Sequence, residues 1–265
     1  MKIAVIGANG QLGSDVVRAF AENGDDVFSL THSEIELSDL DSVAICLRLQ
    51  LPNLVVNTAA MHHVESCEQQ PDKAYAINAL RARNLAMMTH DLGASLIHIS
   101  TDYVFDGKKG GPYIEDDPPL PLNVYGNRKL AGEHFIRSLN QKHFVLRTSA
   151  LYGKQPCRAK GGCNFVDLML RLARERGRVR VVDSETVSPT STADARLLCS
   201  AAAMPTVCTT QRLKGAAPGT NLLKRSFLSP IHKPSWKWRR PKSSCQDTSA
   251  TLLRARKLRA KGPRP

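Results

Sequence analysis

The feature that most constrains the fold is a glycine-rich loop that follows a short apolar run at the start of the chain. Residues 2–6 (KIAVI) are typical of a buried strand, and Gly7 to Gly13 (GANGQLG) comes directly after them. A helical pattern then runs through Val16 and Phe20. Strand, glycine loop and helix in this order predict a dinucleotide site, because the glycines let a pyrophosphate approach the backbone N–H groups of the helix start.

Strands and helices alternate along the rest of the first 180 residues. Strands are expected at residues 26–30, 54–56, 95–100, 144–147 and 179–182. Helices are expected at residues 40–49, where Ser38 or Asp39 caps the start, at 71–90, from about 124, and at 165–174. This alternation predicts an α/β fold of the Rossmann type, with a doubly wound parallel sheet.

The residues after two strands bear on the cofactor. Residues 57–60 (NTAA) follow the strand at 54–56, and their small side chains would let a flat ring or a ribose pack close. Thr31-His32 follows the strand at 26–30, where an acid often holds the ribose of NAD and an arginine often holds the phosphate of NADP. Neither is present, so the choice between NADH and NADPH stays open.

Tyr125 and Lys129 have the spacing of an acid-base pair. Four residues apart on a helix, they lie on one face, and an ammonium group near a phenol favours the phenolate and lowers its pKa. Thr101 and Asp102 follow the buried strand at 95–100, and ligands of open parallel sheets sit outside the carboxyl ends of the strands. We therefore expect these four residues to meet at one site.

Two other stretches have a simpler interpretation. Residues 106–123 form a long loop rich in Gly and Pro, which is expected to be a lid or a substrate loop. His62, His63 and Glu65 resemble a metal cluster, but nothing completes a ligand set, so a packing role in a loop is favoured and no metal site is predicted.

Composition excludes several classes of protein. No apolar run approaches the roughly 20 residues that span a bilayer, and the chain opens at Met1 into a strand without a signal peptide, so a soluble cytoplasmic protein is expected. The seven cysteines are odd in number and irregularly spaced, which fits reduced thiols better than a disulfide framework.

The net charge of +13 is concentrated near the end of the chain. Residues 196–265 hold 16 Lys or Arg and one acid, Asp247, so residues 1–195 hold 37 − 16 = 21 basic and 24 − 1 = 23 acidic residues, a net charge of −2. The part that is expected to fold is therefore nearly neutral, and nucleic acid is not an expected partner of it.

Together these motifs resemble those of the dTDP-4-dehydrorhamnose reductase family, a branch of the extended short-chain dehydrogenases. The similarity covers residues 1 to about 194. It is carried by residues 7–13, 57–60, 100–107 (STDYVFDG), 121–126 (PLNVYG), 129–133 (KLAGE) and 146–149 (LRTS), of which the STDYVFDG run is highly specific.

The resemblance implies reduction of the 4-keto group of dTDP-4-dehydro-6-deoxy-L-mannose to dTDP-L-rhamnose by NADPH or NADH. Tyr125 would protonate the forming alkoxide, Lys129 would lower the pKa of Tyr125 and hold the nicotinamide ribose, and Thr101 would hydrogen-bond the reacting oxygen. A Mg²⁺ requirement is also implied, without residues on which to place it. The expected partner is the nucleotide-sugar substrate; a homodimer is left open, and no membrane is expected.

Family positions also indicate the binding residues. The cofactor would contact Gly7, Gly10, Gln11, Leu12, Gly13, Glu36, Leu37, Asn57, Ala59, Ala60, Tyr125 and Lys129. The sugar would contact Thr101, Asp102 and Ala150. Family members commonly have Trp at the position of Ala150, where it packs on the sugar, so another nucleotide-sugar reductase or epimerase is an alternative. A non-catalytic NADP-binding regulatory homologue is a second alternative.

The resemblance divides the chain into three regions. Residues 1–150 are expected to form the NAD(P)-binding domain, 151–194 a partial, incomplete substrate lobe, and 195–265 a basic tail of low order. The tail has three interpretations: a basic arm for nucleic acid or acidic surfaces, an ordinary disordered extension, or translation out of frame after about Asp194. The last is favoured, because the family match ends abruptly within a motif.

Overall fold

The computed structural model describes residues 1–157, 162–181, 186–195, 199 and 217–218. Its centre is a parallel sheet of five strands in the order β2-β1-β3-β4-β5. The strands are β1 (Lys2–Ile6), β2 (Asp26–Leu30), β3 (Leu54–Asn57), β4 (Ser95–Thr101) and β5 (His143–Thr148). The strand order reverses between β1 and β3, which is where nucleotides bind in doubly wound folds. The predicted fold class is confirmed.

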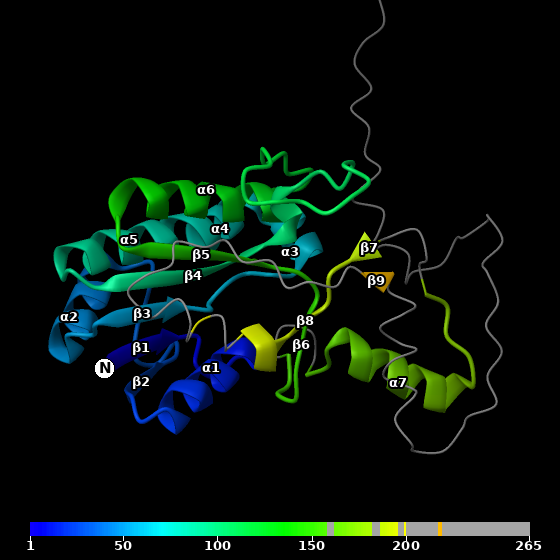
Figure 1. The fold of residues 1–265 in the computed structure, drawn as a ribbon, viewed down its shortest axis with the longest axis horizontal. Coiled ribbons are helices and arrows are strands. Elements are labelled where there is room, and N and C mark those ends of the chain that lie inside the picture. Colours follow the sequence, from blue (N-terminus) through cyan, green and yellow to red (C-terminus); the bar gives the residue numbers. More distant parts are fainter. Residues whose placement is uncertain (158–161, 182–185, 196–198, 200–216, 219–265) are drawn as a thin grey trace, which may run out of the picture.

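Helices cover both faces of this sheet (Figure 1). One face packs on α1 (Gln11–Glu22). The other packs on α2 (Leu40–Gln50), α5 (Arg81–Asp91) and α6 (Val124–Leu139). Side chains of a strand alternate between the two faces, so in β4 Ile97 and Ile99 join the α1 core while Leu96 joins the α5 and α6 core. His98 and Ser100, in phase with Leu96, therefore lie on the α6 side.

The helix expected at residues 71–90 is interrupted. It consists of α4 (Pro71–Tyr75), a π-helical turn η1 (Ala76–Leu80) and α5. At this turn α6 approaches closely, because a Cβ on Gly132 would lie 2.5 Å from the carbonyl oxygen of Asn78. A further helix, α3 (Val64–Gln69), was not expected, and His63 caps it by accepting a hydrogen bond from the N–H of Ser66.

Beyond residue 149 the chain forms smaller elements. β6 (Leu151–Tyr152) pairs in parallel with β8 (Thr190–Ser191), α7 (Phe165–Arg176) lies between them in the sequence, and β7 (Thr186–Val187) pairs with β9 (Ala217–Pro218). The strand expected at residues 179–182 is wrong for 179–181, which follow the C-cap of α7 at Gly177 and form no strand. Residue 182 lies outside the described residues.

The expected basic tail lies mostly outside the described residues, so its three interpretations stay predictions. Four positions in it are described: Ala195 and Cys199 are 1% and 0% exposed in the core on the α1 face, and Ala217–Pro218 form β9. The small apolar side chains of Ala195 and Cys199 fit this burial. Within the described part of the chain no helix has the length and apolarity to cross a membrane, and the five cysteines there are free thiols.

Candidate active site

The glycine loop shapes an anion-binding helix start. Gly10 is the N-cap of α1, no side chain caps the helix, and no acid lies in its first turn. The first backbone N–H groups of a helix have no partner within it, so this end can accept a phosphate. Gly7 has a φ of 78°, and a Cβ on Gly13 would lie 2.1 Å from the carbonyl oxygen of Gly7. The tight turn therefore requires both glycines, and it fits a dinucleotide.

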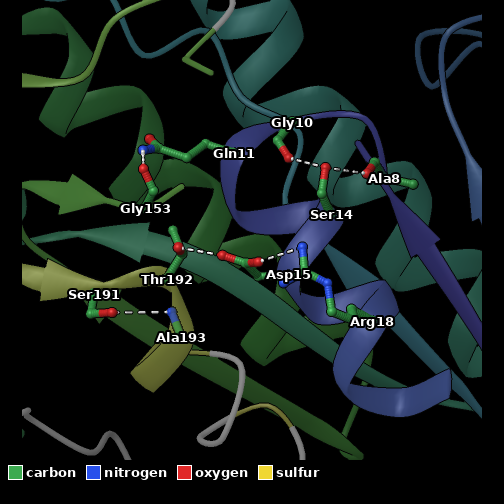
Figure 2. Close-up of polar contacts among 10 residues, drawn as sticks. All are labelled: Ala8, Gly10, Gln11, Ser14, Asp15, Arg18, Gly153, Ser191, Thr192 and Ala193. Carbon is green, nitrogen blue, oxygen red and sulfur yellow. Dashed lines mark hydrogen bonds and ion pairs between the residues drawn. The ribbon is translucent and has the colours of Figure 1, made fainter. Parts of the chain in front are cut away.

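Two residues from the part of the chain after β5, Gly153 and Thr192, hydrogen-bond to this loop and helix (Figure 2). The hydroxyl of Thr192 donates to the buried carboxylate of Asp15 at 2.5 Å, while Arg18 pairs with its other oxygen at 3.2 Å. The amide of Gln11 reaches the carbonyl oxygen of Gly153 at 3.5 Å. The predicted cofactor residue Gln11 is thus connected to the region after β5.

Thr101 and Asp102 lie at the carboxyl end of β4, as expected. Thr101 is 5% exposed and accepts a hydrogen bond from the N–H of Tyr103, which starts the 3-10 turn η2 (Asp102–Val104). The carboxylate of Asp102 accepts from the hydroxyl of Ser149, after the neighbouring strand β5, at 2.6 Å. Two adjacent strand ends therefore share one polar cluster.

Tyr125 reaches the same cluster from the first turn of α6. The helix start is held by Asn123, whose side chain accepts from the N–H of Gly126 at 2.8 Å. Tyr125 is 9% exposed, and its ring packs edge-on against Tyr103 with centroids 5.6 Å apart. Burial raises the pKa of the Tyr125 phenol well above its usual range, and its hydrogen bond with Thr101 opposes this rise.

Lys129 lies one turn further along α6, with its amine turned to β4. Its Nζ donates to the carbonyl oxygen of Ile99 at 2.6 Å and lies 3.0 Å from Nε2 of His98. Burial lowers the pKa of Lys129 to about 8, and the charge of Glu133 opposes this shift. The role expected for Lys129, to lower the pKa of Tyr125, stays a prediction; burial raises the pKa of the phenol, and the amine of Lys129 is engaged by β4.

The other predicted cofactor residues differ in exposure. Ala59 and Ala60 are half-buried in the loop after β3, and Leu12 is buried beneath the helix start. Leu37 is 3% exposed in the core, so only its backbone can face a ligand, whereas Glu36 is exposed and pairs with Arg81 at 2.8 Å. The contacts of these residues with the cofactor stay predictions.

The predicted sugar residue Ala150 has an unusual backbone. Its φ is 43°, in the left-handed region that residues other than glycine rarely adopt. Ala150 is exposed and lies two residues after the end of β5. A methyl group there offers a sugar little contact area. The structure therefore supplies no aromatic platform at this position.

Three buried polar residues at the site were not predicted as site residues: His98, Ser100 and Glu133. His98 is 1% exposed beside Lys129. Glu133 is 0% exposed, pairs with Arg147 at 2.6 Å and accepts a hydrogen bond from Ser100. A signal was present for two of them: His98 is a polar residue inside an apolar strand, and Glu133 is four residues after Lys129 on the same helix face.

The parallel sheet, the glycine loop and the Tyr-x-x-x-Lys helix are together those of the extended short-chain dehydrogenases. The sequence model described as "RmlD substrate binding domain" matches residues 1–216, which extends past the end expected near Asp194. The chain belongs to this family.

Individual relatives agree with this assignment. The chain is 42% identical to a spore coat polysaccharide biosynthesis protein of Bacillus subtilis over 73% of its own length and 66% of that protein. It is 38% identical to the dTDP-4-dehydrorhamnose reductase of Escherichia coli over 72% of its length and 62% of that protein. The match thus spans slightly less than two thirds of these relatives.

A solved structure extends the comparison to three dimensions. The crystal structure of dTDP-4-dehydrorhamnose reductase from Bacillus anthracis in complex with NADP superposes with a TM-score of 0.80 at 34% identity, covering 85% of this chain and 79% of that one.

Proposed function

We propose that the chain reduces the 4-keto group of dTDP-4-dehydro-6-deoxy-L-mannose to dTDP-L-rhamnose with NADPH. The observation that carries the proposal is the meeting of Tyr125, Thr101 and Asp102 at the carboxyl end of β4, on the same edge of the parallel sheet as the helix start at Gly10. The relatives named as dTDP-4-dehydrorhamnose reductases support the substrate, and the NADP complex of the Bacillus anthracis protein supports the cofactor.

The residues of the chain divide the work of binding. The N–H groups at the start of α1 would hold the pyrophosphate, and the small residues Ala59 and Ala60 would lie along the adenosine half. Asp102, kept in place by Ser149, would accept a hydrogen bond from a sugar hydroxyl. When bound, NADPH supplies the hydride that reduces the ketone.

Tyr125 would supply the proton. A phenol keeps its proton at neutral pH, and burial raises the pKa of Tyr125 further, so Tyr125 can donate to an alkoxide that forms at the sugar C4. Thr101 already hydrogen-bonds Tyr125 and would orient the same oxygen. After donation, the phenolate would be stabilised by Thr101 and, when charged, by Lys129.

The test is oxidation of NADPH by the full chain with the 4-keto sugar nucleotide, followed by absorbance. Tyr125→Phe is expected to lower kcat by about 10²- to 10⁴-fold, the usual worth of general acid catalysis, while NADPH still binds. Tyr75→Phe is the matched control, because it removes a phenol from α4 yet keeps the ring that lies 5.1 Å from the Arg128 guanidinium. Normal turnover by Tyr125→Phe would show that another group donates the proton.

Two alternatives become outcomes of this assay. Ala150 motivates a panel of nucleotide sugars, since faster reduction or epimerisation of another sugar would transfer the assignment to it. NADPH binding without turnover of any sugar by the unaltered chain would overturn the reductase proposal in favour of a non-catalytic regulatory role.

The remaining family expectations also stay proposals. Within the described residues no three His, Cys, Asp or Glu side chains lie close enough together to hold a metal ion, so no ligands for Mg²⁺ are assigned. Adding a chelator to the assay would reveal a Mg²⁺ requirement. NADH is compared with NADPH in parallel. The homodimer is checked by sedimentation, and the cytoplasmic location stays a prediction.

A further inference from the structure

A buried chain of polar groups runs from β3 through β4 to the amine of Lys129. Asn57 and His98 are direct partners in the register of β3 and β4, and their side chains share the face that α6 covers. Asn57 is 3% exposed, and His98 and Lys129 are each 1% exposed. Such buried groups must satisfy one another, so the polarity of each hydrogen bond can be worked out.

The carboxamide of Asn57 has a fixed orientation. Its Oδ1 accepts from the backbone N–H of Ala59 at 3.1 Å, and a backbone N–H can only donate. The amide nitrogen Nδ2 therefore faces Nδ1 of His98, at 3.1 Å. Because Nδ2 carries only hydrogens, Nδ1 of His98 must be the acceptor and hold a lone pair.

This fixes the tautomer of His98. A neutral imidazole has one N–H, so its proton lies on Nε2, 3.0 Å from Nζ of Lys129. An ammonium group there would set two donors against each other. A neutral amine instead offers its lone pair to His98 and donates to the carbonyl oxygen of Ile99 at 2.6 Å.

We propose that Asn57 and His98 form a tautomer lock, which favours the neutral amine of Lys129 over the ammonium and makes His98 a positioning residue for the acid-base pair. The ammonium form fits only if His98 moves its proton to Nδ1 and Asn57 turns its Oδ1 toward it. The N–H of Ala59 then loses its acceptor. The charge on Lys129 is thereby coupled to the loop after β3, on which the predicted cofactor residues Ala59 and Ala60 lie.

Other charged groups near Lys129 do not replace the lock. Glu133 on α6 favours the ammonium, but it is engaged by Arg147 on β5, Arg137 and Ser100. Tyr125 on α6 and Asp102 on η2 interact with each other near Thr101. Burial lowers the pKa of Lys129 to about 8 and the pKa of His98 well below its usual range, so the contact between two neutral groups is the form expected above pH 8.

The first test is the tautomer of His98 in the full chain, read from long-range ¹H–¹⁵N NMR correlations and assigned through its own backbone. The Nε2–H form is expected at pH 9, above the pKa of Lys129, where the amine is neutral. The Nδ1–H form, or a doubly protonated ring, at that pH would overturn the lock. This measurement needs no altered residue, so it does not depend on whether a variant folds.

The second test reverses the lock with Asn57→Asp. Both carboxylate oxygens accept, so one can keep the Ala59 N–H while the other takes Nδ1–H of His98, which turns Nε2 into an acceptor for an ammonium. His98 is expected to change tautomer, and the pKa of Lys129, followed by its ¹³Cε shift, is expected to rise by about 1 unit or more. An unchanged tautomer in a folded variant would contradict the lock.

His134→Gln is the matched control, since it alters a histidine on the exposed side of α6 and should leave both readouts unchanged. The role of the lock in proton delivery rests on the proposed reductase function. If the reductase assay fails, the NMR readouts still decide the lock, whereas an intact assay with an Nδ1–H wild type would reject the lock alone.

Discussion

Lys129 shows how the surroundings of one residue decide its chemistry. The same amine that would be an ammonium on a helix surface is 1% exposed here and faces the carbonyl oxygen of Ile99 and the ring of His98. Sequence spacing correctly predicted that Tyr125 and Lys129 share a helix face. The spacing did not show that β4 engages the amine of Lys129, because the strand on which a helix packs is decided by the tertiary fold and not by the local sequence pattern.

The depressed pKa of Lys129 has a measurable consequence for stability. The pKa is lowered to about 8 from 10.5, so between these values the unfolded chain carries a proton that the folded chain has lost. The free energy of unfolding should therefore rise with pH through this window, by roughly 3 kcal/mol relative to Lys129→Met, which cannot titrate. Urea unfolding of both proteins at pH 7.5 and pH 10.5 measures the difference; parallel behaviour of the two would contradict the low pKa.

At the scale of elements, buried strands were the most predictable part. The strands expected at residues 54–56 and 95–100 are found at Leu54–Asn57 and Ser95–Thr101, because apolar runs in α/β folds are buried in the central sheet. The π-turn at Ala76–Leu80 was not predictable from local pattern, and the residue that packs closely against it, Gly132, comes from α6. Contacts between distant segments decide such departures.

The first turn of α6 depends on another close approach. A Cβ on Gly126 would lie 2.2 Å from the carbonyl oxygen of Tyr103, and a backbone atom cannot move as a flexible side chain can. Gly126→Ala is therefore expected to destabilise the fold by about 1–3 kcal/mol, the usual cost of overpacking, and to displace Tyr125. Thermal unfolding and the reductase assay measure these two effects.

Gly111→Ala is the control for that substitution, because a Cβ there meets nothing within 4 Å. It lies in the loop at residues 106–123 and should change stability by less than about 0.5 kcal/mol. Equal losses from the two substitutions would show that the contact with Tyr103 is not what limits position 126.

At the scale of the whole molecule, the segment after β8 (Thr190–Ser191) is connected to α1, next to the glycine loop, by the hydrogen bond from Thr192 to Asp15. Thr192→Val keeps the shape of the side chain but leaves one oxygen of the buried Asp15 carboxylate without its donor. We expect a loss of about 1–3 kcal/mol in the free energy of unfolding. Denaturant titration measures it, with Ser191→Ala as the control at the neighbouring position, since the Ser191 hydroxyl accepts a hydrogen bond from the local N–H of Ala193. A larger loss for the control would contradict this contact.

Prediction from sequence was weakest beyond residue 149. The motifs up to Ser149 positioned the glycine loop, Thr101 and Tyr125 correctly, because each follows a strand or opens a helix. The strand expected at 179–182 was wrong for 179–181, and the burial of Ala195 and Cys199 was not foreseen. Apolar residues in a stretch of basic charge carry no periodicity from which a docking site can be inferred.

The two cores of the sheet differ in when their residues become available. Among the residues that the structure describes, the core beneath α5 and α6 has no buried member after Val145, whereas the core beneath α1 also includes Leu146, Ala195 and Cys199. During synthesis, the core beneath α5 and α6 can therefore be completed before the core beneath α1. In that interval the apolar side chains of Ile97 and Ile99, on the α1 face of β4, would be accessible to a chaperone.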